Sequence, residues 1–108
     1  MLNHQEILFK IAELCGWTHI ESFEAGIYGF KNGEISSYKQ SVPNYTESLD
    51  ACREFEKDAD LTYFFNLAKI VGVNTEAAIL NRRDILAMLN ATPRQRNEAF
   101  LRWKGEWK

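Results

Sequence analysis

The fold is decided at residues 91–107, which read ATPRQRNEAFLRWKGEW and begin with an unusually complete helix start. Thr92 can cap the first free backbone N–H groups, and Pro93 stands where its missing N–H costs nothing. Gln95 follows the cap by three residues, so its side chain can bond back to the backbone of Thr92. The sequence therefore predicts a final helix over about 93–104.

A charged residue, Arg96, lies at the centre of the apolar face of this helix. The face is formed by Ala99, Phe100 and Trp103. At about 100° per residue, Glu56 takes the same central place on a helix expected over about 45–57. Two opposite charges on two apolar faces are most simply explained if they point at each other. We therefore predict that the two helices pack side by side with a buried or half-buried Arg96–Glu56 ion pair. Glu54, on the opposite side of its helix, is the weaker candidate.

A small antiparallel sheet is predicted in the N-terminal half, at about 17–39. Its strands are expected at 17–23, 27–31 and 34–39, where residues with high strand propensity lie between turn signals. Asn32-Gly33 is the strongest sequence signal for a two-residue hairpin turn, and Pro43 closes the meander. We therefore expect an α+β protein, with a short antiparallel meander packed against several helices and a helical C-terminal half.

Apolar residues that recur at three- and four-residue steps predict the other helices. The expected ranges are about 3–15, 45–57, 61–71, 75–90 and 93–104, with an interruption of the fourth near 81–84. Asn3 with Glu6, and Asn44 with Glu47, have the spacing of capping boxes. Residues 61–71 are open to two assignments, because their threonine and aromatic residues also favour a strand; helix is the preferred one.

The same periodicity predicts which residues of two helices face the core. On the helix of about 45–57 they are Tyr45, Leu49, Cys52 and Phe55. On the helix of about 61–71 they are Leu61, Phe64, Phe65, Ala68 and Val71. Both sets are expected to be buried against neighbouring elements.

Length and composition are those of an ordinary globular protein with a single domain, residues 1–108. The chain has 45% apolar and 26% charged residues, and its formal net charge is −2. Residues 1–60 hold eleven acids and five bases, whereas residues 61–108 hold eight bases and four acids. Scattered pairs rather than a block of like charge produce this split, so we expect the two halves largely to neutralise each other.

The sequence identifies no catalytic, cofactor-binding or metal-binding residues. The two histidines lie far apart, and the chain has no catalytic motif and no phosphate-cradling glycine loop. Cys15 and Cys52 are expected to be free thiols on apolar helix faces. Together with His4 and His19 they do not match the spacing of a zinc site. We therefore expect a protein that is not an enzyme.

The strongest binding signal is the basic, tryptophan-containing region 82–108. Its bases are Arg82, Arg83, Arg94, Arg96, Arg102, Lys104 and Lys108. Bases interleaved with tryptophan can grip a phosphate backbone and stack nucleobases, so nucleic-acid binding is the alternative function. The position of Glu98 between Arg94 and Arg102 counts against it. Contact with a partner protein is preferred, and the residues assigned to it are Arg94, Arg102, Lys104 and Trp107. Trp107 is the one expected to be exposed.

Location and oligomeric state are predicted only in outline. No apolar run approaches the ~18 residues needed to cross a membrane, and the N-terminus lacks the layout of a signal peptide. We therefore expect a cytoplasmic protein without membrane association. The outer strands, 17–23 and 34–39, can leave a free sheet edge, and Lys39 is the only basic residue near one end that would oppose pairing with another strand. A homodimer formed by edge pairing is therefore a hypothesis.

The ending of the chain also carries a specific pattern. It consists of Ala91-Thr92, Gln95-Arg96, residues 98–102, Gly105 and Trp107, in the form A-T-x-x-Q-R-x-E-A-F-L-R-x-x-G-x-W. Further pieces are Cys15-Gly16-Trp17, Pro43-Asn44-Tyr45, Leu49-Asp50-Ala51 and Glu54-x-Glu56-Lys57. These residues resemble a group of small bacteriophage and prophage proteins. The group is similar to proteins with the phage ABA-sandwich domain, which implies helices on both sides of a small sheet.

The resemblance implies a viral accessory protein in the cytoplasm of a bacterial host, and it implies no catalytic residue. We expect the protein to act by binding a host or phage protein, such as a host defence or regulatory factor. A nucleic-acid-binding accessory protein that uses region 82–108 is the alternative.

Overall fold

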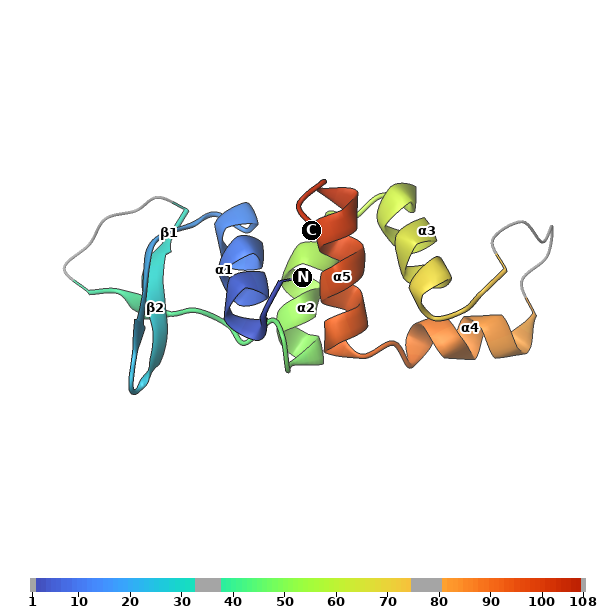
Figure 1. Ribbon diagram of the computed structural model, residues 1–108, viewed down its shortest axis with the longest axis horizontal. Helices are drawn as coiled ribbons and strands as arrows, with labels where there is room; N and C mark the ends of the chain where they lie inside the picture. Colours follow the sequence, from blue (N-terminus) through green and yellow to red (C-terminus); the bar gives the residue numbers. More distant parts are fainter. Residues whose placement is uncertain (1, 33–37, 75–80, 108) are drawn as a thin grey trace.

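The computed structural model describes residues 2–32, 38–74 and 81–107, which form an α+β fold (Figure 1). In chain order the elements are α1 (His4–Leu14), β1 (Trp17–Phe23), β2 (Gly26–Lys31), β3 (Gln40–Ser41), α2 (Leu49–Glu56), α3 (Leu61–Ile70), α4 (Arg82–Leu89) and α5 (Pro93–Trp103). The expected fold class and the helical C-terminal half are confirmed.

The elements follow one another along a single long axis (Figure 1). The sheet lies at one end with α1 against it, α2 and α5 form the middle, and α3 and α4 lie at the other end. The Cα atoms extend over 52 × 24 × 24 Å, and their radius of gyration is 15.3 Å. A compact domain of about 100 residues has a radius of gyration of about 13 Å, so this chain leaves more of its surface open at the two ends.

The three strands form an antiparallel sheet in the order β1-β2-β3. The third strand that the structure describes lies at residues 40–41; of the strand predicted at 34–39 only residues 38–39 are described, and these two are not part of a strand. Gly29 pairs with the first residue of β3, whereas a two-residue turn at Asn32-Gly33 would place its partner earlier in the chain. This register does not fit a two-residue turn at Asn32-Gly33, and residues 33–37 of the predicted turn and strand lie outside the described residues.

Polar side chains cap the start of all five described helices. They are Asn3, Ser48, Asp60, Asn81 and Thr92. The capping boxes predicted for α1 and α5 are confirmed. α2 begins later than expected, because Ser48 rather than Asn44 accepts a backbone hydrogen bond from the first turn. The polar residues at 81–84 begin α4 and do not interrupt it, since Asn81 and Asp84 form a third capping box.

Residues 61–70 are helical, as preferred, and Ala68 of the predicted core face is buried, but the prediction is wrong for three of its members. The exposed residues include Leu61, Phe64 and Phe65, and the buried ones include Tyr63 and Leu67. Apolar residues cover most of the circumference of α3, opposite a narrow polar line of Thr62, Asn66 and Lys69, so their spacing alone leaves several faces open. Tyr63 is buried because its hydroxyl group finds a partner inside the protein, the carboxylate of Glu56 at 2.6 Å.

The central helix is α5, and α1, α2 and α3 all pack against it (Figure 1). Phe100 on α5 stacks on Phe55 of α2, with ring centroids 4.4 Å apart. Phe55 is buried as predicted, whereas Leu49 is exposed because α2 begins there, at the edge of the core. Asn97 is fully buried, and its amide group donates to the carbonyl oxygen of Tyr45 at 2.8 Å. This bond holds the segment before α2 against α5.

The predicted ion pair is present, with Nη1 of Arg96 2.7 Å from Oε2 of Glu56. The two side chains are 14% and 15% exposed. The hydroxyl group of Tyr63 donates to the same carboxylate oxygen. Other N–H groups of the guanidinium donate to the carbonyl oxygens of Ala91 and Leu89, at 3.1 Å each. We call Arg96, Glu56 and Tyr63 the Arg96 cluster; it joins α2, α3, α5 and the end of α4.

All described helices lie on one side of the sheet (Figure 1). The resemblance implied helices on both sides, and for the described residues this expectation is wrong. α1 covers the inner face of the sheet. The outer face carries no helix from the described part of the chain, because α2 and α3 pack against α5 and α4 lies at the opposite end of the molecule.

Arg96→Met should lower the free energy of unfolding by about 3–5 kcal/mol, because it leaves the half-buried carboxylate of Glu56 without its counter-charge. Urea unfolding measures the loss. Arg102→Met is the matched control: Arg102 binds Glu98 at 2.8 Å, but its side chain is 46% exposed. Loss of this exposed pair should cost less than about 0.5 kcal/mol. Equal losses in the two variants would contradict the structural role of the Arg96 cluster.

Candidate functional site

An apolar stripe of α4 faces solvent. Its apolar residues are Ile85, Leu86 and Leu89, and Arg82 begins the same face: the four stand at positions i, i+3, i+4 and i+7 from Arg82. Leu89 is 67% exposed, and none of the residues of α4 is buried. We call these four residues the α4 stripe. Short helices gain most of their stability from tertiary packing, so the fold itself does not account for an apolar face in solvent.

The opposite side of α4 faces the protein, and its C-terminal end is anchored. Ala87 and Met88 are half-buried. Arg96 donates to the carbonyl oxygens of Leu89 (3.1 Å) and Met88 (3.4 Å). A cation at the C-terminus of a helix is favourable. Arg96 therefore stabilises the end of α4 and sets the direction in which this helix leaves α5.

The two arginines at the other end of α4 do not stabilise this helix. Arg82 and Arg83 are exposed in its first turn, where the helix dipole disfavours cations. Asp84 accepts from the backbone N–H of Asn81. No carboxylate of the described residues forms an ion pair with either arginine. Both guanidinium groups are therefore open to a carboxylate of another molecule.

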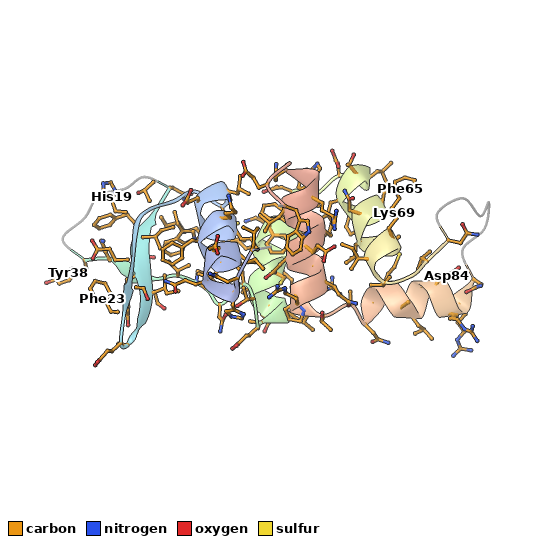
Figure 2. The ribbon with its side chains drawn as sticks, viewed as in Figure 1. His19, Phe23, Tyr38, Phe65, Lys69 and Asp84 are labelled. Atoms are coloured by element: carbon orange, nitrogen blue, oxygen red, sulfur yellow. The ribbon has the colours of Figure 1, made fainter. Side chains whose placement is uncertain are left out.

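Exposed apolar residues of α3 lie at the same end of the molecule. Leu61 is 76% exposed and Phe65 is 52% exposed. Figure 2 shows Phe65 of α3 and Asp84 of α4 at this end of the molecule, and Lys69 of α3 lines a hollow with Glu98 and Arg102 of α5. Single apolar residues on a surface are ordinary, but a group of them rimmed by charges is typical of an interaction site. This end of the molecule is the candidate functional site.

The partner contacts predicted in α5 and beyond it are largely engaged within the protein. Arg102 binds Glu98 at 2.8 Å, and its guanidinium group lies 5.6 Å from the ring of Trp107. Nζ of Lys104 lies 3.9 Å from the indole ring of the preceding residue. Arg94 is exposed, as a contact residue must be.

Trp107 was expected to be exposed, and it is half-buried against the core instead. The chain turns back after α5, because Gly105 takes a left-handed conformation with φ +74°. The backbone N–H of Glu106 then donates to the carbonyl oxygen of Leu101 at 2.8 Å. Lys10 of α1 binds the Glu106 side chain at 3.3 Å. This turn brings Trp107 down onto the helices.

The bases of region 82–108 do not form one continuous stripe. Arg96 and Arg102 are each paired with a glutamate. Arg82 and Arg83 lie on a different helix, at the end of the molecule (Figure 1). Lys108 lies outside the described residues. A phosphate backbone would therefore meet separate cations, several of them already neutralised.

A cleft of about 420 Å³ lies where the C-terminal ends of α1, α2 and α5 meet. Helix C-termini carry partial negative charge, and three lysines in the lining offset it: Lys31, Lys57 and Lys104. Lys31 also binds Glu54 at 2.9 Å. With its charges balanced in this way, the cleft selects neither an anion nor a cation.

A hydrogen-bonded network beside the cleft was not predicted. Glu54 accepts from the hydroxyl group of Tyr45 at 2.8 Å, which in turn accepts from the indole N–H of Trp17 at 3.2 Å. Burial raises the pKa of the Cys15 thiol to about 11 and raises the pKa of Tyr45 as well. Both groups stay protonated at neutral pH, so neither is an activated nucleophile or base. The residues of this network lie far apart in the sequence, so no sequence spacing predicts that they are hydrogen-bonded.

A second cluster joins the start of α1 to the segment before α2. The hydroxyl oxygen of Thr46 lies 2.6 Å from Nε2 of His4, and Glu47 lies 3.9 Å from the same nitrogen. The amide N–H₂ of Asn44 donates to the carboxylate of Glu47 at 3.0 Å. In this orientation the amide oxygen of Asn44 faces Thr46 and accepts from its hydroxyl group at 3.0 Å. The single hydroxyl proton of Thr46 therefore goes to Asn44, and His4 donates to Thr46 instead of taking its proton. The cluster is a structural clamp and lacks the proton path of a catalytic triad.

Residues 2–32, 38–74 and 81–107 hold no group of three or more histidine, cysteine, aspartate or glutamate side chains that could bind a metal ion. Within the same ranges, every helix is too short or too polar to cross a membrane. Comparison of the chain with protein-family models, with curated proteins and with solved structures yields no match.

Raising the pH above about 9 should destabilise the protein. Burial is the main cause that raises the pKa values of Cys15, Cys52, Tyr45 and Tyr63, and the two thiols move from 9.0 to about 11 and about 12. The unfolded chain therefore releases these protons at a lower pH than the folded protein does. The contribution of these four groups to the free energy of unfolding is therefore fully present at a pH below their ordinary pKa values. It is lost as the pH rises toward the raised pKa values of the folded protein.

The midpoint of urea unfolding should accordingly decline between about pH 9 and about pH 11. Tyr63→Phe removes one of the buried groups and should make the decline shallower. Tyr38→Phe, at a position that is exposed, should leave its slope unchanged. A midpoint that stays constant over this range would show that burial of these groups does not govern alkaline stability.

Proposed function

We propose that the protein is a non-enzymatic accessory protein that binds another protein through the α4 stripe. The supporting observation is an apolar, solvent-facing side of α4 that begins with arginines for which no described residue supplies a carboxylate partner. An amphipathic helix that lays its apolar face into a groove is a common mode of protein recognition. The partner's groove then carries a carboxylate at the end that receives Arg82 and Arg83.

The proposed setting is a phage or prophage protein that acts in the cytoplasm of a bacterial host. The tail pattern of residues 91–107 is the support for this origin. The proposed partner is a host or phage protein, with a host defence or regulatory factor as the first class to examine. In this proposal the protein acts by occupying a surface of its partner.

Nucleic-acid binding is the second candidate, and the exposed bases Arg82, Arg83 and Arg94 favour it. Binding to a phosphate backbone depends on several cations that neutralise successive phosphates. Arg96 and Arg102 are held in ion pairs within the protein. This candidate therefore has the weaker support.

Leu86→Gln should weaken partner binding strongly while the protein remains folded. Leu86 is 46% exposed and glutamine is a good helix former, so the free energy of unfolding should change by less than about 0.5 kcal/mol. Binding is measured by capture of proteins from a bacterial host lysate on the immobilised protein, with and without nuclease. The captured partner should decrease about tenfold or more, as for an interface hot spot.

Leu49→Gln is the matched control, because Leu49 is a leucine of α2 with nearly the same exposure, 48%. This variant should capture the partner as well as the unaltered protein does. Equal capture by the Leu86 variant would rule out the α4 stripe as the binding surface. Loss of all capture after nuclease treatment would favour the nucleic-acid candidate.

A further inference from the structure

The cleft where α1, α2 and α5 end has the size of a small-molecule site. Its volume of about 420 Å³ lies within the range of about 300–1,000 Å³ that such sites usually have. The residues that directly follow the three helices, Cys15, Lys57 and Lys104, all line it, and so does Lys31 at the end of β2. We call this space the helix-end cleft. It shares no residue with the α4 stripe.

Backbone groups of the lining can accept hydrogen bonds. The last carbonyl groups of a helix have no partner within the helix. Among the described residues, no backbone N–H group donates to the carbonyl oxygens of Leu14, Phe55 and Trp103, which stand in the last turns of the three helices. Helix C-termini also carry partial negative charge. This part of the lining therefore suits a positively charged group with several donors, such as an ammonium group.

Two carboxylates of the lining add to this negative charge. Glu54 is held in place, because one of its oxygens accepts from the hydroxyl group of Tyr45 at 2.8 Å and the other lies 2.9 Å from Nζ of Lys31. Its side chain is 17% exposed, and each carboxylate oxygen can accept a further hydrogen bond. Asp58 is exposed and forms no ion pair with a described residue. A carboxylate that is fixed before the ligand arrives lowers the entropy cost of binding.

The same lining offers positive charge to a ligand. Lys57 is exposed and has no carboxylate partner among the described residues. The same holds for Lys104, whose Nζ lies 3.9 Å from the centroid of the Trp103 ring. Lys31 differs from both, because it is paired with Glu54. Lys57 and Lys104 can therefore form charge-assisted hydrogen bonds with a carboxylate of the ligand.

Apolar side chains complete the lining. Phe55 stacks on Phe100 with ring centroids 4.4 Å apart, and Trp103 meets Phe100 edge to face at 5.9 Å. Trp103 is half-buried and Leu14 is 41% exposed, so both still have surface that an apolar group of a ligand can remove from water. The helix-end cleft thus combines negative, positive and apolar parts.

We propose that the helix-end cleft binds a free α-amino acid with a large apolar side chain. An anion would meet Glu54 and Asp58, and a cation would meet the lysines, so a ligand with one charge gains at one part of the lining and loses at another. A zwitterion pairs with both parts. Its ammonium group binds the carboxylates and the helix carbonyl groups, its carboxylate binds Lys57 and Lys104, and its side chain covers the aromatic rings.

Titration of the ¹⁵N-labelled protein with L-phenylalanine, followed by NMR, tests the proposal. Backbone amide signals of residues 14–15, 54–58 and 103–104 should shift in a saturable way, with a Kd below about 1 mM. N-Acetyl-L-phenylalanine lacks the ammonium group and L-phenylalanine methyl ester lacks the carboxylate, so each should bind about tenfold more weakly. L-Alanine lacks the aromatic ring and should also bind about tenfold more weakly.

Two variants of exposed residues test the two charges separately. Lys57→Met should raise the Kd of L-phenylalanine about tenfold and leave that of the methyl ester unchanged, because the ester has no carboxylate to lose a partner. Asp58→Asn should raise the Kd of L-phenylalanine about fivefold and leave that of the N-acetyl compound unchanged. Lys69→Met is the matched control: Lys69 is an exposed lysine of α3 outside the helix-end cleft, so the Kd should not change.

The proposal would be overturned if about 5 mM L-phenylalanine caused no saturable shifts. It would also be overturned if the N-acetyl compound or the methyl ester bound as tightly as L-phenylalanine, since the cleft would then select a single charge. Unchanged affinity in both the Lys57 and the Asp58 variants would place the ligand elsewhere. Binding of a protein through α4 is unaffected by any of these outcomes.

Discussion

The ion pair between Arg96 and Glu56 is the interaction on which the arrangement of the helices depends. Apolar contacts have no direction, whereas a half-buried charge must meet its partner at hydrogen-bonding distance or bear a large desolvation cost. Glu56 brings α2 to α5, Tyr63 brings α3 to the same carboxylate, and Arg96 also bonds the carbonyl oxygen of Leu89 at the end of α4. One cluster of side chains thus fixes the relative positions of four helices. We infer that its main contribution is to select one packing rather than to add net stability.

This arrangement leaves the two ends of the molecule open. The core gathers around α5, and the sheet and α4 extend from it in opposite directions along the 52 Å axis (Figure 1). α4 has no buried residue and keeps its direction through the bonds from Arg96, so the same side chain that orders the core also orients the candidate site.

The candidate site was only partly visible in the sequence. Ile85, Leu86 and Leu89 have helical spacing, but the polar residues before them read as a break in the periodicity, because a capping box and an interruption look alike in a hydrophobic pattern. The basic residues of the C-terminal region predicted a partner contact on α5 and just beyond it. There the structure pairs Arg102 with Glu98 and folds Trp107 onto the core. What distinguishes α4 is its exposure, and exposure depends on which neighbours pack nearby.

The sequence by itself determined the local features of this protein. Capping boxes at the starts of α1 and α5 and the first strand depend on residues close together in the chain, and the Arg96–Glu56 pair followed from helical phase, since an isolated charge on an apolar face requires a counter-charge. Only the tertiary structure decided the pairing of β3, which depends on how far the chain runs before it returns. It also decided which side of α3 is buried, because apolar residues cover most of that helix and the choice was made by the partner that Glu56 offers to Tyr63.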